Sequence, residues 1–417
     1  MLQPVEIVAA ALLAAKIAGA SVLDSLDRRE IVRNSGAVPP ALAGVMDGPT
    51  YARAVEYSLA KNAFGRWEDL YGTVVLAVLI FSGVLPRSFA AWTAWAGAAH
   101  WSQALWLVLV GVALAIPDLP FDWWGAFRLE ARFGFNRSTV RLWIVDKIKG
   151  GLVALVLGQA LLWLLLSLVA WAGTWWWIWG FASVMAFQLL MLVLYPLLIL
   201  PLFNKLTPLP EGELKAGLMA LAERTGFRAR TIEVMDGSKR SGHSNAFFTG
   251  FGRFRRIVLF DTLIKQLSPA ELEAVLAHEI GHYKRGHIPK MLAVSAAFLA
   301  CGFFAVDWLM RSPWFLGGFG FGADAGAAPA LLLVALLGGL ATFWLSPLLN
   351  ALSRKHEYEA DAFARAAVNG HAPLVGALRR LAEKNLANLT PHPWFSTFHY
   401  SHPTLVEREQ ALIGSER

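Results

Sequence analysis

Long apolar stretches alternate with polar, charged stretches along this chain. Seven of the apolar stretches are candidate membrane spans, at residues 5–23, 71–85, 92–116, 150–172, 175–202, 289–310 and 328–350. A helix of about 20 mostly apolar residues crosses the hydrocarbon core of a bilayer, and the fourth and fifth stretches meet this length most clearly. The Trp-rich segment 173–177 between them is typical of a membrane–water interface. The pattern predicts a mainly α-helical, polytopic membrane protein with seven transmembrane helices.

The polar stretches divide the chain into four parts. We expect residues 1–202 to form a membrane domain of five transmembrane helices with two long polar loops, 24–70, within which helices are expected, and 118–143. Residues 203–287 are charged and of ordinary hydropathy, which indicates the first part of a water-facing domain. Residues 288–352 then carry spans six and seven, and residues 353–417 complete the water-facing domain.

Within residues 203–287 the pattern predicts short elements. Residues 211–224 have the pattern of an amphipathic helix closed by Gly226. Three short runs at 231–235, 244–249 and 257–260, separated by Gly-rich turns, predict a small β-sheet. Ser268-Pro269-Ala270-Glu271 is a capping box with proline at the first helical position, so a helix is expected to begin there.

That helix carries the motif His278-Glu279-Ile280-Gly281-His282. Residues four apart share a helix face, so His278 and His282 point the same way, as the first two ligands of a zinc ion must. Glu279 can then reach a water molecule as general base. The motif is short, and a polar helix with two surface histidines is the alternative. The capped helix around the motif favours the zinc site.

The sequence offers more than one third ligand. His287 is close in sequence, but on a straight helix it would lie roughly 140° from His282 and face away. Past the seventh span, Glu357 and Asp361 share a face at i, i+4, whereas Glu359 would lie about 200° from Glu357. A solvated charged helix would show the same pattern. A glutamate two helices downstream of the histidine motif is, however, what a gluzincin-type zinc site requires.

The composition supports a membrane protein. Of the 417 residues, 56% are hydrophobic and only 16% are charged, and the mean hydropathy is +0.48, which is more apolar than a soluble globular chain. The lone Cys301 excludes an intrachain disulfide and a cysteine metal cluster. No basic segment precedes the first apolar stretch, so we expect a retained helix and not a cleaved signal peptide.

The net charge of +7 is unevenly placed. With seven spans, the loops 24–70, 118–149 and 203–290 and the C-terminal tail share one side of the membrane and hold nearly all Lys and Arg. The opposite loops hold little beyond Arg87 and Arg311. Because basic loops stay in the cytoplasm, we expect the N-terminus outside and the water-facing domain in the cytoplasm. The charge then reflects membrane topology, and no nucleic-acid partner is expected.

Several motifs occur together in the order typical of one family. They are Phe-Gly-Phe-Asn-Arg at 133–137, Leu-Pro-Leu-Phe-Asn-Lys-Leu-Thr-Pro-Leu-Pro at 200–210, Ser-Gly-His-Ser-Asn-Ala-Phe-Phe at 241–248, the histidine motif at 278–282, Ser-Arg at 353–354 with Glu357 and Ala-Asp at 360–361, and His-Tyr-Ser-His-Pro at 399–403. On these motifs the chain resembles the integral-membrane zinc CAAX prenyl protease family, which processes farnesylated yeast mating pheromone and prelamin A. The resemblance runs along much of the chain.

The resemblance implies a fold. It implies seven helices around a large water-filled chamber, with a gluzincin-like zinc metalloprotease domain containing a small β-sheet at its cytoplasmic end. Polar residues inside the candidate spans are weak hints of a polar chamber lining, although they can also pair between helices. These residues are Lys16, Gln159, Gln188 and Asp307.

The resemblance also implies residue roles. His278, His282 and Glu357 are the implied ligands of one Zn²⁺ per chain, with Glu279 as general base. Asp361 is the implied carboxylate that orients a liganding histidine.

Three further residues match family positions in the active site. Asn245 is implied as a substrate-contacting residue on an edge strand, His402 as a histidine facing the scissile bond, and Arg408 as an active-site arginine. His243 and His399 match motifs without an assigned role, and we expect them to be structural.

These expectations together describe a membrane zinc endopeptidase. It would cleave near the C-terminus of prenylated CAAX-type or other membrane-associated peptide and protein substrates. The short chain and its Trp- and Ala-rich spans suggest a bacterial inner-membrane protein, and bacteria generally lack protein farnesylation. A quality-control protease without prenyl specificity is therefore an alternative. The sequence leaves the oligomeric state open.

Particular residues disfavour two further functions. A non-catalytic membrane chaperone would not need the intact Glu279, because a structural zinc site requires no general base. An intramembrane protease would need the motif inside an apolar span, but charged residues flank it on both sides. These residues are Glu271, Glu273, Lys284 and Arg285.

Overall fold

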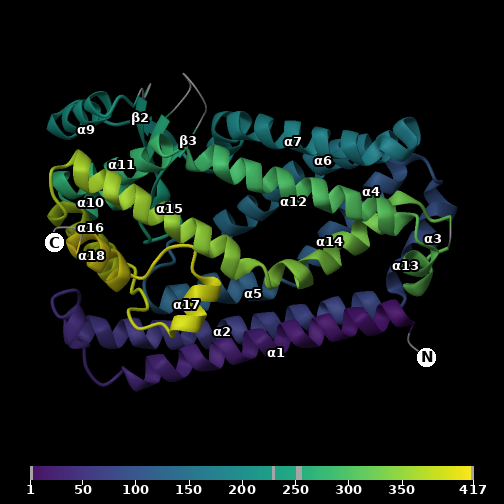
Figure 1. Ribbon diagram of the computed structural model, residues 1–417, viewed down its shortest axis with the longest axis horizontal. Helices are drawn as coiled ribbons and strands as arrows, with labels where there is room; N and C mark the ends of the chain where they lie inside the picture. The colour runs from purple at the N-terminus through teal and green to yellow at the C-terminus, as the bar shows by residue number, and fades with distance from the viewer. Residues whose placement is uncertain (1–2, 228–230, 250–255, 323, 415–417) are drawn as a thin grey trace.

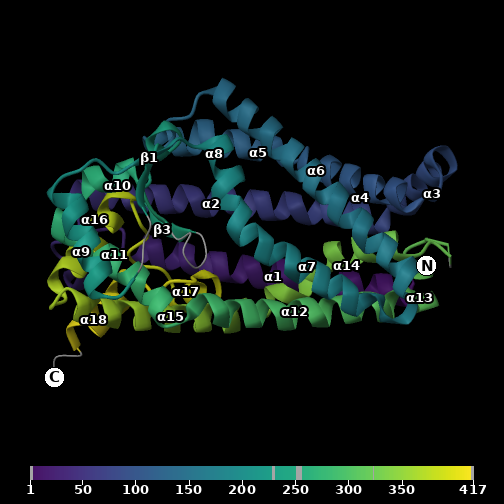
Figure 2. The same ribbon diagram turned by 90° about the horizontal axis from the view of Figure 1, so that it is seen from above.

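Helices dominate the computed structural model, which describes residues 3–227, 231–249, 256–322 and 324–414. The long helices run along an elongated molecule whose termini lie at opposite ends (Figure 1). The strands gather at the end that holds the C-terminus, and the view from above shows the same division (Figure 2). The helices that lie at this end with them are α9 (Glu213–Arg224), α10 (Asp261–Gln266), α11 (Pro269–Lys284), α16 (Ala372–Lys384) and α18 (Leu405–Gly414).

The apolar regions form helices of different lengths, from four to 34 residues. These are α1 (Pro4–Arg33), α2 (Gly48–Phe81), α3 (Val84–Ala96), α4 (His100–Ala115), α5 (Leu119–Trp124), α6 (Val140–Ala172), α7 (Trp176–Leu194), α8 (Leu200–Phe203), α12 (His287–Met310), α13 (Pro313–Gly318) and α14 (Ala327–Phe343). Single π-helical segments, Gly125–Glu130 and Tyr195–Ile199, follow α5 and α7. Short 3₁₀ turns occur at Pro40–Leu42, Gly173–Trp175 and Gly237–Lys239.

Within the described residues, three helical stretches are long and apolar enough to cross a membrane by themselves: Pro4–Arg33, Val140–Phe203 and His287–Met310. The number is up to six if each of three bent helix pairs is one span. The pairs are α2 with α3, bent by 58°, α4 with Leu119–Glu130, bent by 44°, and α14 with α15 (Ser346–Ala367), bent by 66°. The structure therefore has several helices suited to a bilayer, and some of these candidates are broken.

Two predicted loops prove largely helical. α1 continues to Arg33 and α2 begins at Gly48, so only a short part of 24–70 is irregular, and α5 with the following π segment occupies half of 118–143. Hydropathy reports where a helix leaves apolar surroundings, whereas the helix itself continues as long as its backbone bonds are satisfied. Helices within residues 24–70 match the helices expected there, whereas the helical turns within residues 118–143 were not predicted.

Three predicted spans are interrupted. Residues 71–85 include the 58° bend between α2 and α3. Residues 92–116 include the break between α3 and α4, where Gly97 has φ +78°, a conformation that favours glycine. Residues 328–350 include the bend between α14 and α15. Because α15 begins at Ser346 and ends at Ala367, Glu357 and Asp361 lie on a helix that starts within the predicted seventh span.

A four-stranded sheet lies at the C-terminal end of the molecule. Its strands are β1 (Leu206–Pro208), β2 (Thr231–Met235), β3 (Ala246–Thr249) and β4 (Arg256–Phe260), in the order β1-β2-β4-β3. β2 and β4 are parallel, and both outer pairs are antiparallel. Strand β2 matches its prediction, β3 begins two residues later than predicted, and β1 was missed because it is three residues long and ends in proline.

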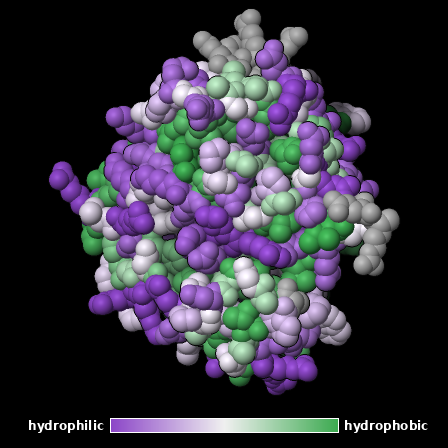
Figure 3. All heavy atoms as spheres, turned by 90° about the vertical axis from the view of Figure 1, so that its left-hand side faces the viewer, coloured by the Kyte–Doolittle hydropathy of each residue, from purple (hydrophilic) through white to green (hydrophobic). Residues whose placement is uncertain are grey.

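Helices α9, α10, α11, α16 and α18 contribute to the core beside this sheet. Helix α17 (Pro393–His399) lies against α1 and α15. The core beside the sheet contains the fully buried side chains Leu218 of α9, Ile257 of β4 and Ile280 of α11. The end of the molecule that these elements form is largely hydrophilic on its outer surface (Figure 3).

The C-terminal segment is tied back to the first two helices. Tyr57 of α2 packs on Phe133 with ring centroids 4.8 Å apart, and both belong to one apolar cluster with Leu386. The buried Asp27 of α1 accepts a hydrogen bond from the His392 amide at 3.0 Å. These contacts hold the segment that contains α17 beside α1 and α15.

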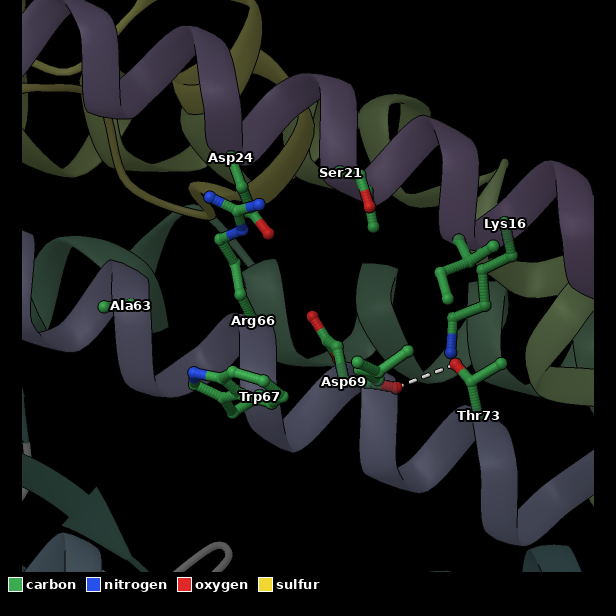
Figure 4. Close-up of a pocket in the computed structure, with 11 residues that line it drawn as sticks. Lys16, Ser21, Asp24, Ala63, Arg66, Trp67, Asp69 and Thr73 are labelled. Carbon is green, nitrogen blue, oxygen red and sulfur yellow. Dashed lines mark hydrogen bonds between the residues drawn. The ribbon is translucent and has the colours of Figure 1, made fainter.

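Lys16 lies at a polar pocket between α1 and α2. The pocket measures about 350 Å³ and is lined by Asp24, Arg66 and Asp69 among others. Figure 4 shows these side chains directed into the space between the two helices, and Thr73 donates to the Asp69 carbonyl at 2.7 Å. Charged groups of both helices therefore gather at this pocket.

Candidate active site

Helix α11 supplies three of the candidate residues. Ser268 is its N-cap, both halves of the capping box are formed, and Pro269 occupies the first helical turn. The helix therefore starts where the sequence predicts, and its spacing brings the Nε2 atoms of His278 and His282 within 3.2 Å of each other.

Helix α15 supplies the carboxylate. Glu357 Oε1 lies 3.2 Å from His282 Nε2, and Glu357 Oε2 lies 3.5 Å from His278 Nε2. The three side chains each offer one ligand atom, and these atoms all lie within 4.8 Å of one another. Of the candidates that the sequence left open, Glu357 is the one in this group.

The cluster fits a zinc ion. Two Nε2 atoms 3.2 Å apart cannot both carry protons directed at each other, so at least one presents a lone pair. Glu357 is 3% exposed, and its Oε2 has no hydrogen-bond partner among the described residues. A buried carboxylate oxygen without a donor is costly, and a cation among these three groups would satisfy it. Two imidazoles and a carboxylate are also a typical catalytic zinc set.

The close approach of α11 and α15 depends on Gly281, a residue that the sequence reasoning missed. A Cβ on Gly281 would lie 3.0 Å from the Cα and 3.0 Å from the carbonyl oxygen of Ala360. Both are backbone atoms of a packed helix, so they cannot move aside easily. The signal in the sequence was a glycine inside the motif, three residues after His278.

Asp361 and Arg408 lie behind His278. Asp361 Oδ1 is 2.8 Å from His278 Nδ1, and Arg408 donates to both Asp361 oxygens at 2.6 and 2.8 Å. All three side chains are buried. Burial also lowers the pKa of His278, which favours the neutral imidazole that binds metal. The structure thus brings together the histidine, the carboxylate and the arginine that the sequence singled out.

Glu279, Asn245 and His402 face a common pocket of about 400 Å³, together with the ligand cluster. Burial raises the pKa of the Glu279 carboxyl to about 7. His402 is exposed, its Nε2 lies 3.4 Å from Glu357 Oε1, and its Nδ1 lies 3.0 Å from Ser401 Oγ. The apolar side of the pocket comes from α16, with Leu374, Leu378 and Leu381.

Asn245 was predicted to lie within a strand, but in the structure it lies immediately before β3. Its carbonyl accepts from the Phe260 amide at 3.1 Å, and its side-chain oxygen accepts from the Ala246 amide at 2.8 Å. β3 is an outer strand of the sheet, and Ala246 and Phe247 line the pocket. A strand edge therefore lies beside the ligand cluster.

The prediction that His287 faces away from the motif was wrong. Helix α11 ends at Lys284, and Gly286 adopts φ +66°, so the chain turns and α12 begins at His287. His287 Nδ1 consequently lies 2.9 Å from His282 Nδ1. It faces the side of His282 opposite to Glu357 and is not part of the ligand group.

His243 and His399, the two motif histidines without an assigned role, do not line the pocket beside the ligand cluster. His243 contacts Glu130 at 3.2 Å and Asn385 at 3.0 Å, and the hydrogen bond to Glu130 raises the pKa of His243. His399 packs against Phe395 with ring centroids 4.6 Å apart, and burial lowers its pKa. Both positions suit the structural roles expected of them.

Comparisons with known proteins agree with this geometry. The family model described as CAAX prenyl protease N-terminal, five membrane helices, matches residues 28–205, and the model of peptidase family M48 matches residues 208–416. CAAX prenyl protease 1 of Saccharomyces cerevisiae is 36% identical over 411 residues, which cover 90% of this chain and 88% of the yeast protein. The chain belongs to the CAAX prenyl protease family.

Two further members extend the comparison. The human CAAX prenyl protease 1 homolog is 32% identical, over 92% of this chain and 90% of its own. The crystal structure of S. mikatae Ste24p superposes with a TM-score of 0.91 at 33% identity, covering 98% of this chain and 99% of that one. The protein is thus a multi-pass membrane zinc metalloprotease with the fold of this family. The relatives named here are eukaryotic and give no support to the expected bacterial origin.

Proposed function

We propose that this protein hydrolyses peptide bonds near the C-terminus of CAAX-type substrates, prenylated ones in particular. The observation that carries the proposal is the buried group of His278, His282 and Glu357 beside Glu279, in a pocket flanked by a strand edge. The printed names of the relatives supply the substrate class. The two imidazoles and the carboxylate would hold one zinc ion per chain.

The chemistry divides between the metal and the side chains. A zinc ion held there would supply positive charge that stabilises the negative oxygen developing on the scissile carbonyl. Glu279 takes the proton from the attacking water and later delivers it to the leaving amine. His402, exposed at the mouth of the pocket, donates a hydrogen bond to the same developing charge.

Two other groups prepare this arrangement. Asp361 accepts the Nδ1 proton of His278, which leaves the Nε2 lone pair for the metal. Arg408 holds Asp361 ionised and in place through its two hydrogen bonds. Both act on the ligands and not on the substrate.

The outer edge of β3, the last strand of the sheet in the described residues, is the proposed binding site for the substrate backbone. An extended peptide can add to a sheet edge by main-chain hydrogen bonds, and Asn245 at the start of β3 is placed to fix its register. The apolar wall of Leu374, Leu378 and Leu381 would then face alternate substrate side chains.

In the membrane we propose seven crossings around an internal chamber. The 64-residue stretch Val140–Phe203 contains α6 and α7, which pack on each other after a turn at Gly173, so it suits two crossings. These two crossings, the helices Pro4–Arg33 and His287–Met310, and the three bent helix pairs make seven. The polar pocket at Lys16 supports a hydrated interior between the helices. The distribution of basic residues supports an external N-terminus and a cytoplasmic position for residues 203–287 and 353–417, which together form the zinc domain.

A cleavage assay with matched peptides tests the function. The purified protein should cleave a farnesylated CAAX peptide, lose this activity with a zinc chelator, and cleave the unprenylated peptide less well. Glu357→Ala should lose zinc, and Asn245→Ala should keep zinc but turn over more slowly. Equal cleavage of both peptides would favour a quality-control protease without prenyl specificity. Stoichiometric, tight zinc in Glu357→Ala would remove Glu357 from the site.

A further inference from the structure

A second histidine–carboxylate pair lies behind the metal site, on the side of His282. His287 Nδ1 is 2.9 Å from His282 Nδ1, and His287 Nε2 is 3.0 Å from Glu359 Oε2. His287 is only 4% exposed and stacks on His356, with ring centroids 4.0 Å apart at 15°. The three polar groups therefore form one chain from the ligand cluster to the protein surface.

Hydrogen-bond accounting fixes the protons along this chain. To bind a metal, His282 must present its Nε2 lone pair, so its proton resides on Nδ1. That proton can only be donated to a lone pair on His287 Nδ1, because a proton on each atom would clash at 2.9 Å. His287 must then carry its own proton on Nε2, where the Glu359 carboxylate accepts it. Each tautomer follows from the previous one.

Glu359 is placed to end the chain. It is a carboxylate on α15, two residues after Glu357, and Lys290 and Lys355 lie 3.6 and 4.0 Å from its oxygens. These ammonium groups favour the ionised form that accepts from His287. Glu359 points away from Glu357 on α15, so Glu359 is not a metal ligand. The same direction places Glu359 next to His287.

We propose that His287 and Glu359 position His282 for metal binding, as the indirect counterpart of Asp361 behind His278. The inference rests on the proposed zinc site. α15 would then support the site three times along one helix, with Glu357 in the ligand group, Asp361 directly behind one histidine, and Glu359 behind the other through His287. Partners of this kind orient the imidazole and raise its basicity.

Zinc affinity, measured by chelator competition on the full-length protein, tests the proposal. Loss of an orienting partner typically costs about 10- to 100-fold in metal affinity. We expect a loss of this size in His287→Leu, and a smaller one in Glu359→Ala. His287→Asn keeps an acceptor near the Nδ1 position, and Glu359→Gln keeps an acceptor for the His287 proton, so both should bind zinc better than their apolar counterparts.

Controls separate positioning from folding. Lys265→Met removes a charge from an exposed side chain of α10 that pairs with Asp261 and has no role in the proposed chain, so it should leave zinc affinity unchanged. The melting temperature of each zinc-free variant reports on packing alone. Wild-type zinc affinity in both His287→Leu and Glu359→Ala would overturn the proposal, and so would an equal loss in His287→Asn and His287→Leu. These results would overturn the role of His287 and Glu359 but not the zinc site itself. The zinc site would be contradicted by a different result, namely tight zinc binding in Glu357→Ala.

Discussion

At the scale of single residues, the chemistry depends on what each group touches and not only on its type. Three carboxylates of α15 and one of α11 surround the two histidines, yet only Glu357 joins their Nε2 atoms, while Asp361 meets an Nδ1 atom. Glu279 follows His278 directly, lies in the pocket with the cluster, and is not in the ligand group. Removing the charge of Glu357 should therefore weaken metal binding, whereas removing the charge of Glu279 should slow the reaction and leave the metal in place.

Glu279→Gln should separate these two functions. The substitution keeps the size of the side chain and removes the proton acceptor, so we expect peptide cleavage to fall by about 10²–10⁴-fold. Zinc content and melting temperature should stay near those of the wild type, because the two histidines and Glu357 remain. Metal analysis and a cleavage assay on the same preparation measure both. Zinc loss would make Glu279 a ligand, and near-normal cleavage would assign the proton to another group, with His402 as the next candidate.

At the scale of elements, the site depends on how closely α11 and α15 pack. The sequence specified α11 well, because a capping box, a proline and an apolar period all indicate the same helix. It also indicated that Glu357 and Asp361 share a face. It could not indicate that α15 crosses α11 at Gly281, because that contact joins residues nearly 80 positions apart in the chain.

The same limit explains the failed prediction for His287. The argument assumed one straight helix through His278, His282 and His287, but Gly286 in the left-handed region redirects the chain. A glycine directly before His287 was the available signal. The strand β1 and the helix α5 within residues 118–143 were missed for related reasons, because tertiary packing, and not local hydropathy, decides where such elements begin and end.

Gly281→Ala tests the packing of the two helices. The added methyl would meet backbone atoms of Ala360 at 3.0 Å, and overpacking of this kind typically costs about 1–3 kcal/mol. We expect a lower melting temperature and weaker zinc binding, since α15 must shift and take Glu357 with it. Gly302→Ala on α12 is a matched control, because a Cβ there meets nothing within 4 Å. Wild-type stability and zinc affinity in Gly281→Ala would show that the helices are free to separate without cost.

At the scale of the whole molecule, the zinc domain is continuous with the membrane helices. α15 runs from the bend after α14 into the ligand cluster, α12 begins at His287 directly behind it, and Asp27 of α1 holds the C-terminal segment. The hydrophilic outer surface of this end fits a position in water (Figure 3). Which side of the membrane it faces follows, in our proposal, from the basic residues.

Cysteine labelling tests that orientation. In a Cys301→Ser background, Lys265→Cys places a thiol on an exposed side chain of the zinc domain, and Gly317→Cys places one on α13 at the opposite end, where a side chain meets nothing within 4 Å. In sealed vesicles with their cytoplasmic face outward, an impermeant maleimide should label Lys265→Cys at once and Gly317→Cys only after detergent is added. The two sites are separated in the chain by α12, so the expected pattern also requires that this helix crosses the membrane. The reverse pattern would place the zinc domain outside, and it would mean that the Lys and Arg residues near the zinc domain serve its surface and do not set the topology.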